Sequence, residues 1–93
     1  MIDAALKPAL SSKARLRFDR HAQRYMLLYP EKGLVLNETG AEIAKLCTGE
    51  HSVAEIAERL SARWPEVARE RIDAELDAFL HALLERALIR DAR

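Results

Sequence analysis

The fold is decided by residues 25–40, which read YMLLYPEKGLVLNETG. The segment opens with an apolar, aromatic-rich run, YMLLY, and continues after a turn with a second apolar run, GLVL. Pro30 suits the second position of this turn, and Gly33 is free to take a positive φ. Asn37 then offers the side chain of a helix N-cap. The segment therefore predicts two antiparallel strands that lead directly into a helix.

A third strand is predicted upstream of this segment. Residues 15–18, which read RLRF, alternate between charged and apolar side chains with the period of two that is typical of a half-buried strand. The polar residues 19–23 connect this run to the next one. We expect the strands 15–18, 25–29 and 33–36 to form an antiparallel meander, in which the middle strand is paired on both sides.

The first two helices are predicted from their end signals. The first helix begins at Asn37, or at Thr39 with a glutamate in the capping-box spacing, and Gly49 suits its C-terminal end. The second begins with a clearer capping box at Ser52 and ends where Trp64 precedes a proline. Helices of this length are common in small globular domains.

The third helix is the longest, and it completes the expected α+β fold. It should start near Ala68 and end near Leu88. Residues 1–13 lack a clear period and are expected to be a flexible N-terminal arm, so residues 14–93 form a single domain. A three-stranded antiparallel meander followed by three α-helices resembles a winged helix-turn-helix whose strands have moved forward in the chain. The apolar positions that predict the third helix are Ile72, Leu76, Phe79, Leu80, Leu83 and Ala87.

Composition and charge exclude several classes of protein. The chain has 93 residues, of which 49% are hydrophobic and 32% charged, as expected for one soluble globular domain. Fifteen basic and fifteen acidic side chains leave no net charge, which argues against nucleic acid or an anionic membrane as the main partner. The charges are unevenly distributed, with +4 over residues 1–36 and −4 over residues 37–93. No signal peptide or membrane-spanning run is recognisable, so we expect a cytoplasmic protein.

Side chains that could carry catalysis are scattered along the chain. His21, His51 and His81 are far apart and have no cysteine or carboxylate at the spacing of metal ligands. Cys47 lies on the apolar stripe of the first helix, so we expect a packed and inert thiol in a reducing compartment. No nucleophile elbow and no phosphate-binding loop is present. We therefore expect neither an enzyme nor a bound metal or cofactor.

Three kinds of partner remain open. The second helix, residues 53–63, would read DNA in a winged-helix transcriptional regulator, but its balanced charge fits a phosphate-lined groove poorly. An outer strand of the meander exposes one open edge, which can accept an extended peptide as an additional strand. The same edge can pair with a second copy of the chain, which would make a homodimer.

The sequence also resembles a known family. The resemblance covers residues 14–90, and its most specific parts are the strand RLRFD at 15–19 and the run LLYPEKGLVLNETG at 27–40. Further matches lie at 43–47 and at 53–56. Together, in this order, these segments resemble PqqD, the family of pyrroloquinoline quinone (PQQ) biosynthesis protein D.

The resemblance implies a peptide chaperone of PQQ biosynthesis, related to the domains that recognise the leaders of ribosomally made, modified peptides (RiPPs). Such a chaperone presents a short precursor peptide to a radical S-adenosylmethionine (SAM) enzyme, which cross-links a glutamate and a tyrosine of that peptide. The iron–sulfur chemistry then belongs to the partner enzyme. The peptide would add as a strand beside the third strand and lie against the third helix. The peptide-binding residues implied in this way are Gly33, Leu34, Val35, Leu36, Ile72, Glu75, Leu76, Phe79 and Leu83.

Overall fold

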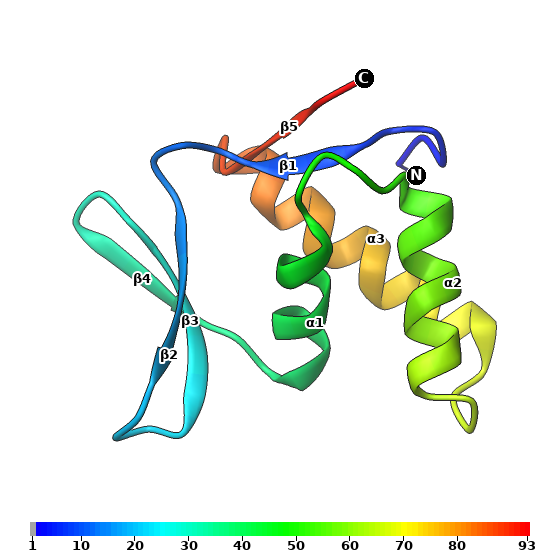
Figure 1. Ribbon diagram of the computed structural model, residues 1–93, viewed down its shortest axis with the longest axis horizontal. Coiled ribbons are helices and arrows are strands. Elements are labelled where there is room, and N and C mark those ends of the chain that lie inside the picture. Colours follow the sequence, from blue (N-terminus) through cyan, green and yellow to red (C-terminus); the bar gives the residue numbers. More distant parts are fainter. Residues whose placement is uncertain (1) are drawn as a thin grey trace.

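The computed structural model describes residues 2–93, and Met1, the first residue of the expected arm, lies outside the described residues. The chain has an α+β fold in which a three-stranded sheet lies beside three helices and a two-stranded sheet crosses over them (Figure 1). In chain order the elements are β1 (Pro8–Leu10), β2 (Arg15–Asp19), β3 (Arg24–Tyr29), β4 (Lys32–Val35), α1 (Glu38–Leu46), α2 (Val53–Arg63), α3 (Arg69–Glu85) and β5 (Ile89–Asp91).

The predicted meander is confirmed. Strands β2, β3 and β4 are antiparallel neighbours in that order, so β3 is the middle strand. Leu16, Leu27 and Leu34 lie opposite one another across the three strands. Side chains at paired positions share one face of a sheet, and this face is turned toward the helices because Leu27 is fully buried. The alternation of residues 15–18 therefore corresponds to a strand that has one face toward the helices.

The β3–β4 hairpin differs from the prediction in one detail. Tyr29 pairs with Lys32, so the connection has only two residues, and the positive φ of 63° falls on Glu31. Gly33 was expected to be free to take a positive φ, but the turn closes before it and does not require one. Gly33 instead gives room to two side chains, because a Cβ placed there would lie 3.1 Å from Met26 Cε and 3.3 Å from a Leu28 methyl group.

The helices begin where the capping signals predicted. Asn37, rather than Thr39, caps α1, and its side-chain oxygen accepts a hydrogen bond from the Gly40 N–H at 2.7 Å. The capping box of α2 is complete, since Ser52 and Glu55 each accept a hydrogen bond from the other's backbone N–H. Helix α3 ends at Glu85, three residues before the predicted end near Leu88, because Ala87 takes a positive φ of 56°.

The N-terminal segment is ordered, which corrects the expectation of a flexible arm. Strand β1 pairs antiparallel with β5 at the other end of the chain, where Pro8 lies opposite Asp91. On its other side the segment binds the loop after α1, where the Leu10 N–H donates to the Cys47 carbonyl oxygen at 3.0 Å. The side chains of Ile2 and Ala9 are buried. Residues 2–13 are fixed by these hydrogen bonds and by packing against the helices. Their irregular sequence pattern does not indicate these contacts.

The hydrophobic core lies between the helices, with α3 in contact with both α1 and α2. The meander contributes Leu27 and, just after β4, Leu36. Among residues 2–93, no helix is both long and apolar enough to cross a membrane. The fully buried side chains of the helices and of the segment after α3 include Ile43, Ile56, Leu60, Leu76, Leu80, Leu83 and Leu88.

Candidate functional site

The free edge of β4 is the first component of the candidate site. The Leu36 N–H donates to the Tyr25 carbonyl oxygen at 2.9 Å, so Leu36 points its backbone groups at β3. Hydrogen-bonded pairs alternate along an antiparallel ladder, and Leu34 therefore also faces β3. The backbone N–H and C=O groups of Gly33 and Val35 consequently point away from the sheet. Among residues 2–93, no other strand pairs with β4 on this side.

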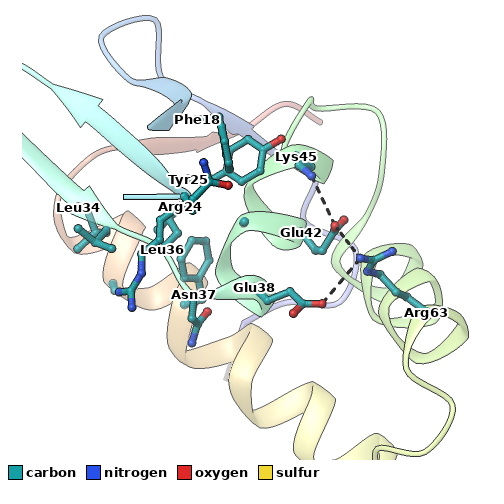
Figure 2. A pocket seen from close by; sticks show the side chains of 15 residues that line it. Phe18, Arg24, Tyr25, Leu34, Leu36, Asn37, Glu38, Glu42, Lys45 and Arg63 are labelled. Carbon is teal, nitrogen blue, oxygen red and sulfur yellow. Dashed lines mark ion pairs between the residues drawn. The ribbon is translucent and has the colours of Figure 1, made fainter. Parts of the chain in front are cut away.

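An open groove runs beside this edge. It has a volume of about 980 Å³ and lies between the inner face of the meander, α1 and α3. Figure 2 shows Leu34 and Leu36 on one side of the groove and the charged side chains of α1 and α2 on the other. Strand residues in its wall include Phe18, Tyr25, Leu34, Val35 and Leu36, and helix residues include Ala41, Glu42, Lys45, Phe79 and Ala82.

Aromatic side chains form the part of the groove nearest α1. The rings of Phe18 and Tyr25 meet edge to face, with their centroids 5.1 Å apart. The Lys45 ammonium lies 4.4 Å from the centre of the Tyr25 ring, in a cation–π contact. Phe18 is nevertheless 46% exposed. This surface can therefore still bury an apolar side chain of a bound molecule.

Ion pairs close the far end of the groove. Arg63 of α2 lies 3.8 Å from Glu38 and 3.5 Å from Glu42, and Lys45 lies 3.5 Å from Glu42 (Figure 2). These side chains are largely exposed, apart from that of Glu42, so each pair adds at most about 1 kcal/mol to stability. Their charges compensate one another, so this end of the groove attracts neither sign strongly.

A close approach of α1 to α3 positions Phe79 in the groove. A Cβ at Gly40 would lie 3.1 Å from the Phe79 ring and 3.1 Å from the Asn37 side-chain oxygen. Glycine at this buried position therefore lets the first turn of α1 and its cap lie directly against the ring. The α3 wall of the groove depends on this small residue.

Several of the implied peptide-binding residues do surround the groove. Leu34, Val35, Leu36 and Phe79 line it, although Leu36 is only 4% exposed. Gly33 is exposed on the free edge of β4. Glu75 lies apart from these residues, in a smaller hollow of about 300 Å³ on the other side of Phe79, where it is paired with Arg71 at 3.5 Å.

The other three implied residues lie in the core. Ile72, Leu76 and Leu83 are at most 2% exposed, so they offer no surface to a bound peptide. The apolar stripe of α3 faces the other helices, and the groove borders the neighbouring stripe that includes Phe79 and Ala82. These three residues are therefore structural here, because a single apolar periodicity does not separate core positions from groove positions.

Sequence reasoning also missed parts of the site. Phe18 and Tyr25 were assigned only to strands, and Lys45 and Ala82 were not singled out. One signal was available in the sequence. Phe18 is two residues after Leu16 in the same strand, so its aromatic ring lies on the same, inner face as Leu16. That α1 and not only α3 would form a wall could not be read from the chain, since it depends on how the helices pack.

Groups for covalent or metal chemistry are not gathered at this groove. Within residues 2–93, no cluster of three or more histidine, cysteine or acidic side chains could hold a metal ion. Burial raises the pKa of the Cys47 thiol to about 12, so the group is protonated at neutral pH. The groove and the β4 edge can therefore bind a molecule through main-chain hydrogen bonds, apolar contacts and complementary shape.

Comparisons with known proteins give the same assignment from three directions. The family model of coenzyme PQQ synthesis protein D (PqqD) matches residues 24–89. A protein of Rhodopseudomonas palustris named PqqA binding protein is 34% identical over 92 residues, covering 99% of this chain and 89% of that protein. Its namesake from Pseudomonas aeruginosa is 40% identical over 73 residues, covering 78% of this chain and 77% of that protein.

A solved structure shares the fold. The solution NMR structure of the PqqD truncation of Methylobacterium extorquens PqqCD matches with a TM-score of 0.75 and 28% sequence identity. The match covers 89% of this chain and 87% of that one, which is described as a functional, stand-alone RiPP recognition element. The family suggested by the segments at 15–19 and 27–40 is thereby confirmed. From its sequence and from its fold, this chain belongs to the PqqD family of coenzyme PQQ synthesis proteins.

Proposed function

We propose that this chain binds the precursor peptide of PQQ biosynthesis and presents it to a radical SAM enzyme. The names of the relatives, PqqA binding protein, and the description of the NMR structure as a RiPP recognition element support peptide binding. In this proposal the chain works in the cytoplasm as a chaperone and not as an enzyme, and the iron–sulfur and SAM chemistry belongs to its partner. The buried, protonated Cys47 is consistent with a role that uses no thiol.

The observation that carries the proposal is the free edge of β4 beside the groove. A peptide strand added there would exchange hydrogen bonds with the outward-facing backbone groups of Val35. Its side chains would then alternate, with every second one lying on the same face as Leu34 and Leu36, toward Phe79 of α3. The edge supplies sequence-independent affinity, and the groove selects side chains by size and polarity.

A proline substitution tests the strand addition directly. Val35→Pro removes the outward-facing N–H of Val35, while all β3–β4 hydrogen bonds keep their donors. We expect peptide binding to be lost, with only a small decrease in melting temperature. The measurement is isothermal titration with the synthetic precursor peptide, accompanied by a circular dichroism melt of each variant.

Two matched variants complete this experiment. Leu34→Pro removes an N–H that faces β3, so it should lower the melting temperature strongly. Val35→Ala keeps the N–H and shortens only an exposed side chain, so it should bind the peptide almost as well as the wild type. A folded Val35→Pro variant with wild-type affinity would rule out strand addition at this edge.

The α3 wall can be tested without disturbing the core. Ala82 is half-buried and lines the groove, so the long side chain in Ala82→Arg should fill the space that peptide side chains would occupy. Ala74→Arg places the same side chain at an exposed position of α3 away from the groove and serves as the control. We expect binding to be lost only in Ala82→Arg, and equal binding by both variants would contradict this wall.

Two finer assignments form part of the same proposal. The meander beside α1–α3 corresponds to the wing of a winged-helix-like arrangement.

A homodimer would use the same β4 edge and would therefore compete with the peptide. Sedimentation of the protein with and without peptide separates the two uses of the edge, since peptide should dissociate a dimer formed there.

A further inference from the structure

The cations of the meander differ from those of the rest of the molecule. Residues 15–36 contain five basic and two acidic side chains. Among residues 2–93, every ion pair lies outside this stretch, within or between the helices and the chain termini. The acidic side chain of Asp19 instead accepts hydrogen bonds from the turn, from the N–H groups of His21 and Ala22. The positive charge of the meander is thus left uncompensated within these residues.

Two of these cations, both on β2, lie along one side of an apolar patch on the outer face of the meander. The strand register places Arg17, Met26 and Val35 in one row and Arg15 and Leu28 in the next. Because paired residues share a face, these five side chains lie on the side opposite Leu27 and the helices. We call them the outer face.

The apolar centre of the outer face is compact and partly open. The side chains of Met26 and Leu28 converge over Gly33, within 3.1 and 3.3 Å of where its Cβ would lie. Val35 beside them is 52% exposed, and both arginines are exposed. Apolar side chains bordered along β2 by two arginines without an ion-pair partner have the composition of an interface with an acidic partner.

A second copy of this chain fits the outer face poorly. A two-fold symmetric contact would bring Arg15 and Arg17 of both copies together and leave the cations unpaired. Pairing the face with the acidic helical half of another copy would be a head-to-tail contact, which forms larger rings or open chains and not a dimer. A DNA duplex would satisfy the arginines but offers its phosphates, and no apolar surface, to Met26 and Leu28.

We propose that the outer face docks an acidic surface of a protein partner, while the neighbouring β4 edge remains free for the peptide. This inference rests on the proposed function, in which the partner is the radical SAM enzyme that receives the peptide. Val35 joins the two surfaces, because its side chain lies on the outer face and its backbone groups lie on the free edge. A peptide bound to β4 would therefore lie directly next to the docked enzyme.

Charge reversal separates the two surfaces experimentally. The double variant Arg15→Glu/Arg17→Glu changes the sign of the outer face without touching the β4 edge. Titration with the radical SAM enzyme should show binding weakened by roughly tenfold or more, since two charge contacts become repulsive. Titration with the precursor peptide alone, without enzyme, should show affinity within about twofold of the wild type. Wild-type binding to the enzyme should also weaken as salt is raised.

Two controls fix the interpretation. Arg59→Glu/Arg90→Glu makes the same change in net charge at exposed arginines of α2 and β5, and it should leave enzyme binding unchanged. Arg15→Lys/Arg17→Lys keeps the charge and should retain most of the enzyme affinity. Enzyme binding that survives the Arg15→Glu/Arg17→Glu change, or a wild-type protein that does not bind the enzyme, would overturn the proposal.

Other outcomes assign the outer face to another partner and equally overturn the proposal. Tight binding of a random DNA duplex that the Arg15→Glu/Arg17→Glu change abolishes would identify a nucleic-acid surface. Loss of concentration-dependent oligomers in this variant would identify a contact between copies. Peptide titration of the wild type tests the proposed function separately, so a protein that binds no peptide would disprove peptide binding and leave the docking result readable.

Discussion

The helical part of the molecule and the meander β2–β4 differ in what their side chains do. In the helices, most of the large apolar residues are buried, and charged residues pair across and along the helices. In the strands of the meander, Leu27 is the one fully buried side chain, Phe18 and Val35 are exposed, and no ion pair is present among these described residues. We therefore expect the helical part to contribute most of the stability, and the meander, with the groove walls of α1 and α3, to contribute most of the binding surface. Stability and binding should then respond to different mutations.

The largest effect on stability is expected in the centre of α3. Leu80 is fully buried, and Leu80→Ala should lower the free energy of unfolding by about 2–5 kcal/mol. Phe18→Ala removes a larger but half-exposed side chain from β2 and should cost clearly less. Urea denaturation of the two variants measures the difference. Equal costs would mean that the meander is as much a part of the core as α3.

The helix caps sharpen the comparison, because one lies at the groove and the other does not. Ser52→Ala and Asn37→Ala each remove a side-chain acceptor from a helix N-terminus and should each cost about 1 kcal/mol of unfolding free energy. Asn37 also lines the groove beside Phe79, so only Asn37→Ala should weaken peptide binding as well. Denaturation and peptide titration of both variants check this. Weaker binding in Ser52→Ala would contradict the division of roles.

A smaller, opposite effect is expected in the β3–β4 turn. Glu31 has a φ of 63°, a conformation that asparagine and glycine adopt more readily than glutamate. Glu31→Asn should therefore raise the unfolding free energy by up to about 1 kcal/mol, and Glu31→Gly should give a similar or smaller gain. Thermal melts measure this. A loss of stability in both variants would show that the Glu31 side chain makes a contact of its own.

The smallest effect concerns the chain termini and appears only in acid. Hydrogen bonds from Arg93 and from the Lys7 N–H lower the pKa of Asp91 from 3.8 to about 2. A carboxyl whose folded pKa is lowered adds stability above its unfolded pKa, and this is lost as the pH falls through the folded value. Asp91→Asn should therefore lose less melting temperature than the wild type between pH 5 and about pH 2. An equal loss in both proteins would contradict the prediction.

The sequence predicted the elements whose signals are local. The meander, the cap of α1 at Asn37 and the capping box at Ser52 were all predicted correctly, because each depends on residues at most a few positions apart. The sequence suggested Gly33 as a residue free to take a positive φ, but it is Glu31 that takes one, because residue types alone do not show that the turn has only two residues. The family could be recognised because its segments keep their order along the chain.

The residues that form the site could be predicted only in part. Of the residues expected to bind a peptide, Leu34, Val35 and Phe79 line the groove, whereas Ile72, Leu76 and Leu83 lie in the core. A helical stripe in the sequence shows which side chains are apolar. It does not show which of them another helix will cover, and this decides whether an apolar side chain stabilises the fold or binds a partner.

The sequence by itself determined the three strands of the meander, the three helices, their order and the separation of charge between the two halves. These follow from periodicity, capping and turn chemistry, which act over a few residues. Only the tertiary structure decided that Pro8–Leu10 pairs with Ile89–Asp91, and that α1 and α3 together wall the groove beside β4. Strands of three residues are too short to show a period, and contacts between the two ends of the chain form only when the packed helices bring them together.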